Sequence, residues 1–134
     1  MAQDKYWMTS EGSVNIPCVL DEDVALSYVV AKIATDGDVG IADSTSDNII
    51  GIIQRTGDSG DVVNVRIQGV SFARLNSASE IDAGINVCAT TGGYITTATD
   101  GQRVVGKTLV NVSGIDSVVP IIIVPGCNQI EDVA

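Results

Sequence analysis

The chain of 134 residues contains no histidine, and this absence excludes several kinds of active site. Histidine is the general base of Ser/His/Asp and Cys/His nucleophilic systems and a frequent ligand of catalytic zinc. The sequence also has no glycine-rich phosphate-binding loop of the Walker or dinucleotide type. Turn aspartates such as Asp36, Asp38 and Asp43 lack a bidentate glutamate at EF-hand spacing. We therefore expect a protein that is not an enzyme and uses no cofactor or metal.

Basic and aromatic residues are also scarce. Seven Lys and Arg residues stand against 17 Asp and Glu residues, which gives a net charge of −10, and aromatics make up 4% of the chain. Binding to nucleic acid or to an anionic membrane needs clustered positive charge, whereas the basic residues here are scattered singly. We expect neither as a partner. The acidic balance instead predicts attraction to a basic protein surface, which weakens as salt rises.

Long apolar runs and paired cysteines are missing as well. The longest apolar stretch, Val118 to Val124, is far shorter than the roughly 20 residues of a membrane-spanning helix. Residues 1–10 lack the basic region and apolar run of a signal peptide. Three cysteines, Cys18, Cys88 and Cys127, are an odd number at unpatterned spacings, which predicts reduced thiols. These features predict synthesis in a cytoplasm.

The chain is rich in aliphatic residues arranged at strand period. Hydrophobic residues reach 45%, and alternation such as Val14, Ile16, Cys18 and Leu20 is typical of a strand with one buried face. Further strands are expected at 29–34, 39–42, 49–55, 62–75, 85–89, 94–98, 104–112 and 118–124, with short helical turns at 21–23 and 79–82. Many short strands with tight turns predict an all-β fold, a small antiparallel barrel or sandwich.

The sequence is also internally duplicated. A shift of 55 positions (106 − 51) places residues 30–51 on 85–106 without a gap, so that Gly51 falls on Gly106. Each copy is a β-unit too small to bury its apolar face alone. We predict an N-terminal arm with the first strand at 1–22, a duplicated β-domain at 23–124 with copies at about 24–75 and 79–124, and an acidic tail at 125–134.

One strand differs between the copies on its outer face. Core-facing Val63, Val65 and Ile67 correspond to Val119, Ile121 and Ile123, but the opposite face changes from Asn64, Arg66 and Gln68 to Pro120, Ile122 and Val124. An exposed apolar strand favours aggregation, and proline fits only an edge or a bulge, so a cover is expected. Either loops or the N-terminal segment cover it, or it is a subunit interface made by Val118, Pro120, Ile122 and Val124.

The second copy resembles a known family. The run from Ala83 to Val87, the hairpin from Thr91 to Thr96 and the strand from Val104 to Lys107 are similar to small capsid decoration, or cement, proteins of tailed bacteriophages. The resemblance covers about residues 23–124. It implies a non-enzymatic homotrimer on the outer surface of the virion, bound to the major capsid protein and stabilising contacts between capsid subunits.

The N-terminal leader departs from that family pattern and contains the only tryptophan. We predict an arm that adds a strand to a capsid protein, with Tyr6, Trp7, Met8, Val14 and Ile16 in contact; a disordered or self-packed terminus is the alternative. Other functions also remain open. A head fibre base or tail-associated protein predicts few copies per particle, and a small trimeric β-enzyme of the nucleotide-hydrolase kind lacks its motifs here.

Overall fold

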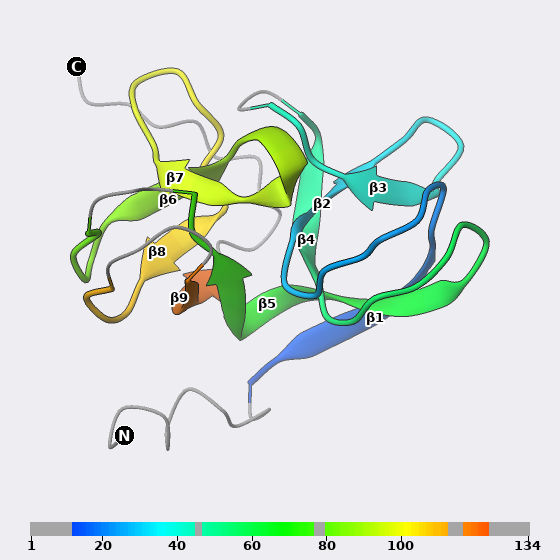
Figure 1. Cartoon of the computed structure of the whole chain (residues 1–134), viewed down its shortest axis with the longest axis horizontal. Helices are drawn as coiled ribbons and strands as arrows, with labels where there is room; N and C mark the ends of the chain where they lie inside the picture. Colours follow the sequence, from blue (N-terminus) through cyan, green and yellow to red (C-terminus); the bar gives the residue numbers. More distant parts are fainter. Residues whose placement is uncertain (1–11, 45–46, 77–79, 113–116, 124–134) are drawn as a thin grey trace.

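The predicted all-β class is confirmed by the computed structural model, which describes residues 12–44, 47–76, 80–112 and 117–123 (Figure 1). Its strands are β1 (Val14–Val19), β2 (Val30–Ile33), β3 (Val39–Ile41), β4 (Ile49–Ile53), β5 (Val62–Arg74), β6 (Asn86–Ala89), β7 (Ile95–Thr97), β8 (Gly106–Thr108) and β9 (Val118–Ile123). They form one nine-stranded sheet in the order β3-β2-β4-β5-β9-β8-β6-β7, and β1 pairs with β5. Every strand pair is antiparallel.

Helical structure in the described part of the chain is limited to one 3₁₀ turn, Thr91–Gly93. The helical turn expected at residues 21–23 is wrong, because the backbone there bonds to distant strands. The Asp21 N–H donates to the carbonyl of Val39, and the Val24 N–H donates to that of Gly57. These donors are therefore used across the fold and not within a local turn.

Strand β5 connects the two halves of the molecule (Figure 1). Its first half pairs with β1 and β4, and its second half pairs with β9. The two halves meet at Gly69, whose φ of +99° is rarely adopted by other residues. A Cβ at Gly69 would also lie 2.7 Å from the Ser13 hydroxyl oxygen. Glycine at position 69 thus permits β5 to change direction and residues 12 and 13 to pass close to it.

Strand pairing divides the molecule into two equivalent units, residues 14–68 and 69–123. Ala31 pairs with Ile41 and Gly51, whereas Val87 pairs with Thr97 and Gly106. The offsets are 56 (87 − 31), 56 (97 − 41) and 55 (106 − 51). The first unit therefore contains β1, β2, β3, β4 and the first half of β5, and the second contains the rest of β5, β6, β7, β8 and β9. These units include β1, which the sequence division assigns to the arm.

Each unit is curled by a contact between its first and third strands. Leu20, directly after β1, bridges Val39 on β3, and Leu75, directly after β5, bridges Ile95 on β7. The offsets of 55 (75 − 20) and 56 (95 − 39) are again those of the repeat. Each unit is therefore a small curled barrel rather than a flat sheet.

The repeated glycines Gly51 and Gly106 have the same structural reason. A Cβ at Gly51 would overlap the carbonyl oxygen of Arg66, and one at Gly106 would overlap that of Ile122. Both obstacles are backbone of the neighbouring strand, which cannot turn aside as a side chain can. Both units thus need glycine where the fourth strand approaches the fifth.

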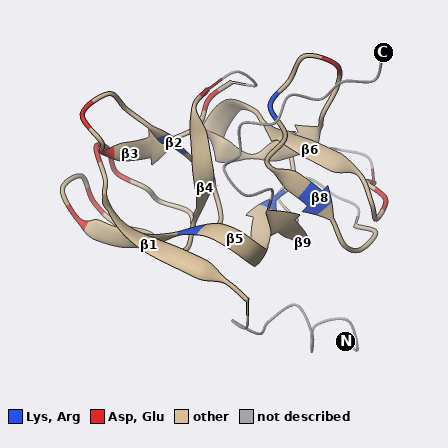
Figure 2. Cartoon of the chain, turned by 180° about the vertical axis from the view of Figure 1, so that it is seen from behind, with Lys and Arg blue, Asp and Glu red and all other residues tan. Residues whose placement is uncertain are grey.

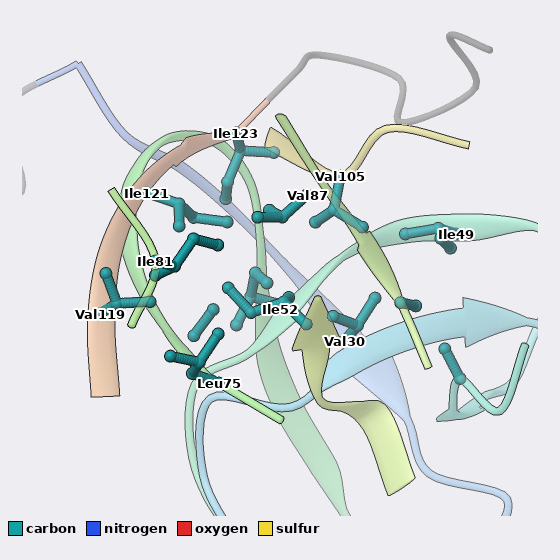
Figure 3. Packing of buried hydrophobic residues seen from close by; sticks show 14 residues of the cluster. Val30, Ile49, Ile52, Leu75, Ile81, Val87, Val105, Val119, Ile121 and Ile123 are labelled. Carbon is teal, nitrogen blue, oxygen red and sulfur yellow. The ribbon is translucent and has the colours of Figure 1, made fainter. Parts of the chain in front are cut away.

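Two main hydrophobic clusters fill the molecule. The first lies inside the first unit and contains Leu20, Val24, Val29, Ala31, Val39, Ile53, Val63 and Val65. The second fills the second unit but also takes in side chains of the first (Figure 3). Its members from the first unit are Val30, Ala42, Ile49 and Ile52, which we call the covering face. The two units are therefore packed together by a shared core.

Pro120 lies inside the sheet, so the expectation that it marks an edge or bulge is wrong. Strand β9 lies between β5 and β8, and Pro120 is opposite Phe72. The Pro120 carbonyl accepts a hydrogen bond from the N–H of Leu109, one residue beyond the end of β8. The proline nitrogen faces the same side as its carbonyl, where the β8 ladder has ended. Only the reciprocal bond, from residue 120 to the Leu109 carbonyl, is lost at the end of this ladder, so the proline is tolerated.

Candidate functional site

The described residues include two cysteines and several acidic side chains. Among them, no group of three or more Cys, Asp and Glu side chains is placed to hold a metal ion. Nor does the described part contain a helix long and apolar enough to cross a membrane. Cys18 and Cys88 are free thiols, and burial raises the pKa of each. Both are therefore mostly protonated at neutral pH and weakly nucleophilic.

The candidate site is an apolar hollow at one end of the first unit. It has a volume of about 250 Å³ and is lined by four isoleucines from four strands: Ile16, Ile33, Ile50 and Ile67. Ile50 and Ile67 pack against the core of the first unit, whereas Ile16 and Ile33 are 36% and 39% exposed. Among the described residues, the hollow is thus an uncovered end of a hydrophobic core.

In the second unit the equivalent end is closed. The strand pairing places Ser71, Ala89, Val105 and Ile123 at the positions of the four isoleucines, with offsets of 55, 56, 55 and 56. None of these four side chains is more than 3% exposed. Two equivalent barrel ends therefore differ, one being covered and the other open.

The cover of the second unit comes from the first. Val105 and Ile123 of this end belong to the same buried cluster as the covering face (Figure 3), and so does Ala89. Gln54, which follows β4, donates a hydrogen bond of 2.9 Å from Nε2 to the Ser71 hydroxyl. A Cβ at Gly93 would lie 2.7 Å from Cβ of Val29, so the β6–β7 turn also lies against the first unit. An aliphatic sheet face is therefore what fits an open end in this fold.

The loops beside the hollow are acidic. Residues 34–38 follow Ile33 and residues 43–48 precede Ile50, and the Ile33 N–H donates to the carbonyl of Asn48. The aspartates of the two loops are Asp36, Asp38, Asp43 and Asp47. Lys32 balances part of this charge, with its ammonium 3.7 Å from the Asp43 carboxylate. Figure 2 shows this acidic colouring at the loops of the first unit.

The Asp47 carboxylate is ionised at neutral pH. Burial pushes its pKa upward, but hydrogen bonds from the N–H groups of Asp43 and Ser44, the charge of Lys32 and the Ser44 hydroxyl outweigh that effect. The net result is a pKa below the ordinary aspartate value. The apolar hollow thus has a negatively charged rim.

The residues predicted for the capsid-binding arm fall in different places. Val14 and Ile16 lie on β1 and are 41% and 36% exposed, and only Ile16 lines the hollow. Tyr6, Trp7 and Met8 lie outside the described residues, as do Val124 and the acidic tail. The role of all of them remains a prediction.

The residues predicted for a subunit interface are only partly accessible. Val118 and Ile122 are 38% and 47% exposed, whereas Pro120 between them is buried. The first copy has the expected polar face, where Asn64 and Gln68 are exposed and the Arg66 guanidinium donates to Asn15. The difference between the outer faces is therefore present in the structure.

Ile122 shares its face with a lysine. Lys107 on β8 is opposite Ile122, which in turn is opposite Val70 on β5. Residues opposite each other in a sheet lie on the same face. Lys107 is exposed and Val70 is partly exposed. We call Val70, Lys107 and Ile122 the Lys107 face; Figure 2 shows β8 in blue.

Three residues of the hollow were not predicted as site residues from the sequence. Ile67 was assigned to the core, and Ile33 and Ile50 look like ordinary strand residues. The usable signal is the size difference between repeats, because Ile16, Ile33 and Ile50 correspond to Ser71, Ala89 and Val105. The size difference can be recognised only when the hydrogen-bond register of each strand is known, because the register decides which residues correspond.

Comparison with known proteins adds a fold likeness. No protein-family model matches the chain, and no curated protein sequence matches it either. A solved structure of similar fold is the N base of head fibre gp8.5 of bacteriophage phi29. The TM-score is 0.60 at 18% sequence identity, over 89% of this chain and 98% of the other. The shared fold therefore extends over both units.

Proposed function

We propose that this chain is a non-enzymatic structural protein of a phage virion and forms the base of a fibre on the head. The observation that carries this proposal is the fold likeness to a head fibre base, which covers nearly the whole of both chains. A fold by itself hosts many functions, so the sequence must agree with the proposed function. The sequence agrees with a structural role, since histidine-dependent catalysis is excluded and the acidic charge suits attachment to a basic protein surface.

The interpretation as a head fibre base is preferred over the interpretation as a decoration protein. The sequence resemblance to decoration proteins has no matching family model to support it, whereas the fold likeness is to a fibre base. Both readings place the chain on the outer surface of the virion with the major capsid protein as its partner. They differ in whether the protein carries a projecting fibre or lies across capsid subunits as a homotrimer.

Imaging of virions tests the proposal. Particles made without this chain should lose density that projects outward from the head, while the shell beneath is unchanged. Adding back the purified full chain should restore density at the attachment points. Density that is lost from the tail, or no difference between the particles, would contradict the proposed function. Flat density across neighbouring capsid subunits at threefold positions would favour decoration instead.

The N-terminal segment is the proposed attachment arm. Deleting residues 2–11 should abolish co-sedimentation with heads, because it removes Tyr6 and Trp7 as hydrophobic anchors. The folded domain should keep its circular dichroism spectrum and thermal midpoint. Deleting residues 128–134 at the other end is the matched control and should leave binding intact. Full binding by the 2–11 deletion would show that attachment uses another surface.

A further inference from the structure

The second unit shows how an open barrel end is covered in this fold. Val30 and Ile52 of the covering face are opposite each other on β2 and β4, and both are buried against the second unit. Because the units share their strand pairing, the same contact can in principle close the hollow of the first unit. The cover would then be the outer face of the second unit of another chain.

The hollow has no such cover among the described residues. Ile33 on its wall is 39% exposed, whereas its equivalent Ala89 is fully buried. Burial of apolar surface stabilises association by about 25 cal/mol per Å². Four isoleucines, two of them exposed and two partly buried, gathered in one concave site thus favour a docked apolar partner.

The equivalent outer face of the second unit is the Lys107 face. In the first unit the row across the sheet is Val30, Ile52 and Arg66, and in the second it is Asn86, Lys107 and Ile122. The offsets are 56, 55 and 56. Ile122 is 47% exposed and supplies an apolar contact surface. Lys107 is thus the counterpart of Ile52 in the covering face, and Ile122 and Val70 extend the same outer face onto β9 and β5.

The charges of the two surfaces are complementary. A lysine can lay its methylene stem on apolar surface while its ammonium reaches a charged or hydrated site. Lys107 placed over the isoleucines would bring its ammonium to the rim that carries Asp36, Asp38 and Asp47. In the second unit Gly92 and Tyr94 are the counterparts of Asp36 and Asp38, and Asp100 is the acidic residue of the loop that corresponds to residues 43–48. The acidic rim of the hollow thus favours the Lys107 face, which carries a cation, over a purely aliphatic face.

We propose that the apolar hollow of one chain binds the Lys107 face of a second copy of the same chain. The two surfaces differ, so the contact is head to tail and every copy keeps one of each. Such contacts form a closed ring if the rotation closes and a filament if it does not. The inference goes beyond virion attachment and does not depend on it.

Two single variants and their mixture test the contact. Ile33→Lys places a cation in the hollow, and Ile122→Asp places an anion on the opposite face. Both side chains are exposed, and Val62→Asp is the control because Val62 is 54% exposed and lies on neither surface. Circular dichroism and thermal unfolding establish that all three variants fold. Masses in solution are measured by light scattering over a range of concentrations.

The expected result is specific to a head-to-tail contact. The full chain and Val62→Asp should exceed the monomer mass of 13.9 kDa, while Ile33→Lys and Ile122→Asp should each be monomers. Mixed together, the two variants should form a 1:1 complex, because the pair retains one intact hollow and one intact Lys107 face.

Four results would overturn the inference. The first is a full chain that stays monomeric at every concentration, and the second is a mixture of the two variants that stays monomeric. The third is an Ile33→Lys variant that still assembles while Ile122→Asp does not. The fourth is assembly that appears only when residues 2–11 are deleted. The third would mean that the Lys107 face pairs with itself. The fourth would mean that the N-terminal segment fills the hollow.

Discussion

Ile52→Ala is expected to lower the free energy of unfolding by about 2–5 kcal/mol, the range for removing a fully buried aliphatic side chain. Ile52 is 0% exposed and belongs to the cluster that joins the two units. Removal of the Ile52 side chain leaves a cavity between the units. The strands that line this cavity are held in place by the hydrogen bonds to their neighbours. Urea unfolding followed by circular dichroism measures the change.

The matched control for Ile52 is Ile50→Ala on the same strand. Ile50 lines the open hollow and is only partly buried, so the smaller side chain leaves no closed cavity. We expect a clearly smaller loss of stability than for Ile52→Ala. Equal losses for the two variants would show that the covering face does not hold the units together. Both variants are measured with Ile122→Asp present, so that any self-association does not contribute.

Gly93→Ala is expected to destabilise the protein by about 1–3 kcal/mol more than Gly37→Ala, the cost of overpacking a tight contact. The two glycines are equivalent residues of the β6–β7 and β2–β3 turns, with φ of +78° and +92°. The cost of a left-handed backbone, about 1–2 kcal/mol for a residue with a Cβ, is therefore common to both. Only the surroundings differ.

The surroundings of Gly93 are tightly packed. A Cβ there would lie 2.7 Å from Val29 Cβ and 2.8 Å from an Ile41 side-chain carbon, whereas a Cβ at Gly37 would meet nothing within 4 Å. Thermal unfolding in the Ile122→Asp background should separate the two variants by several degrees, given the usual relation between stability and midpoint for a domain of this size. Coincident midpoints would contradict the packing between the units.

Much of the fold could be predicted from local sequence patterns. Alternating apolar residues identify the strands, because side chains of a strand point to opposite faces in turn. The repeated glycines mark equivalent turns and close approaches, and Gly51 and Gly106 have the same backbone obstacle. The long strand at 62–75 is likewise confirmed as β5.

The division into units was harder to predict. The last strand of the first unit runs without a turn into the first strand of the second, so no loop marks the boundary at Gly69. An ungapped alignment at 55 also hides the offset of 56 in β2 and β3. Which residues are equivalent depends on hydrogen-bond register, and one residue of slip exchanges the two faces of a strand.

The candidate site shows the same limit. The contrast of Arg66 with Ile122 is visible in the sequence and marks an unusual outer face. The hollow is not visible, since Ile16, Ile33, Ile50 and Ile67 come from four separate strands. Nor does the sequence show that the first unit covers the second. Both features arise from long-range packing between strands that are distant along the chain.

By itself the sequence determined the all-β class, the duplication, the acidic charge and the exclusion of histidine-dependent catalysis, because these follow from composition and from short periodic patterns. Tertiary structure decided which barrel end is closed and which remains open. The two units share one pairing scheme, but the described residues supply one aliphatic cover. Within this part of the chain, packing Val30 and Ile52 onto the second unit leaves the four isoleucines of the first unit uncovered.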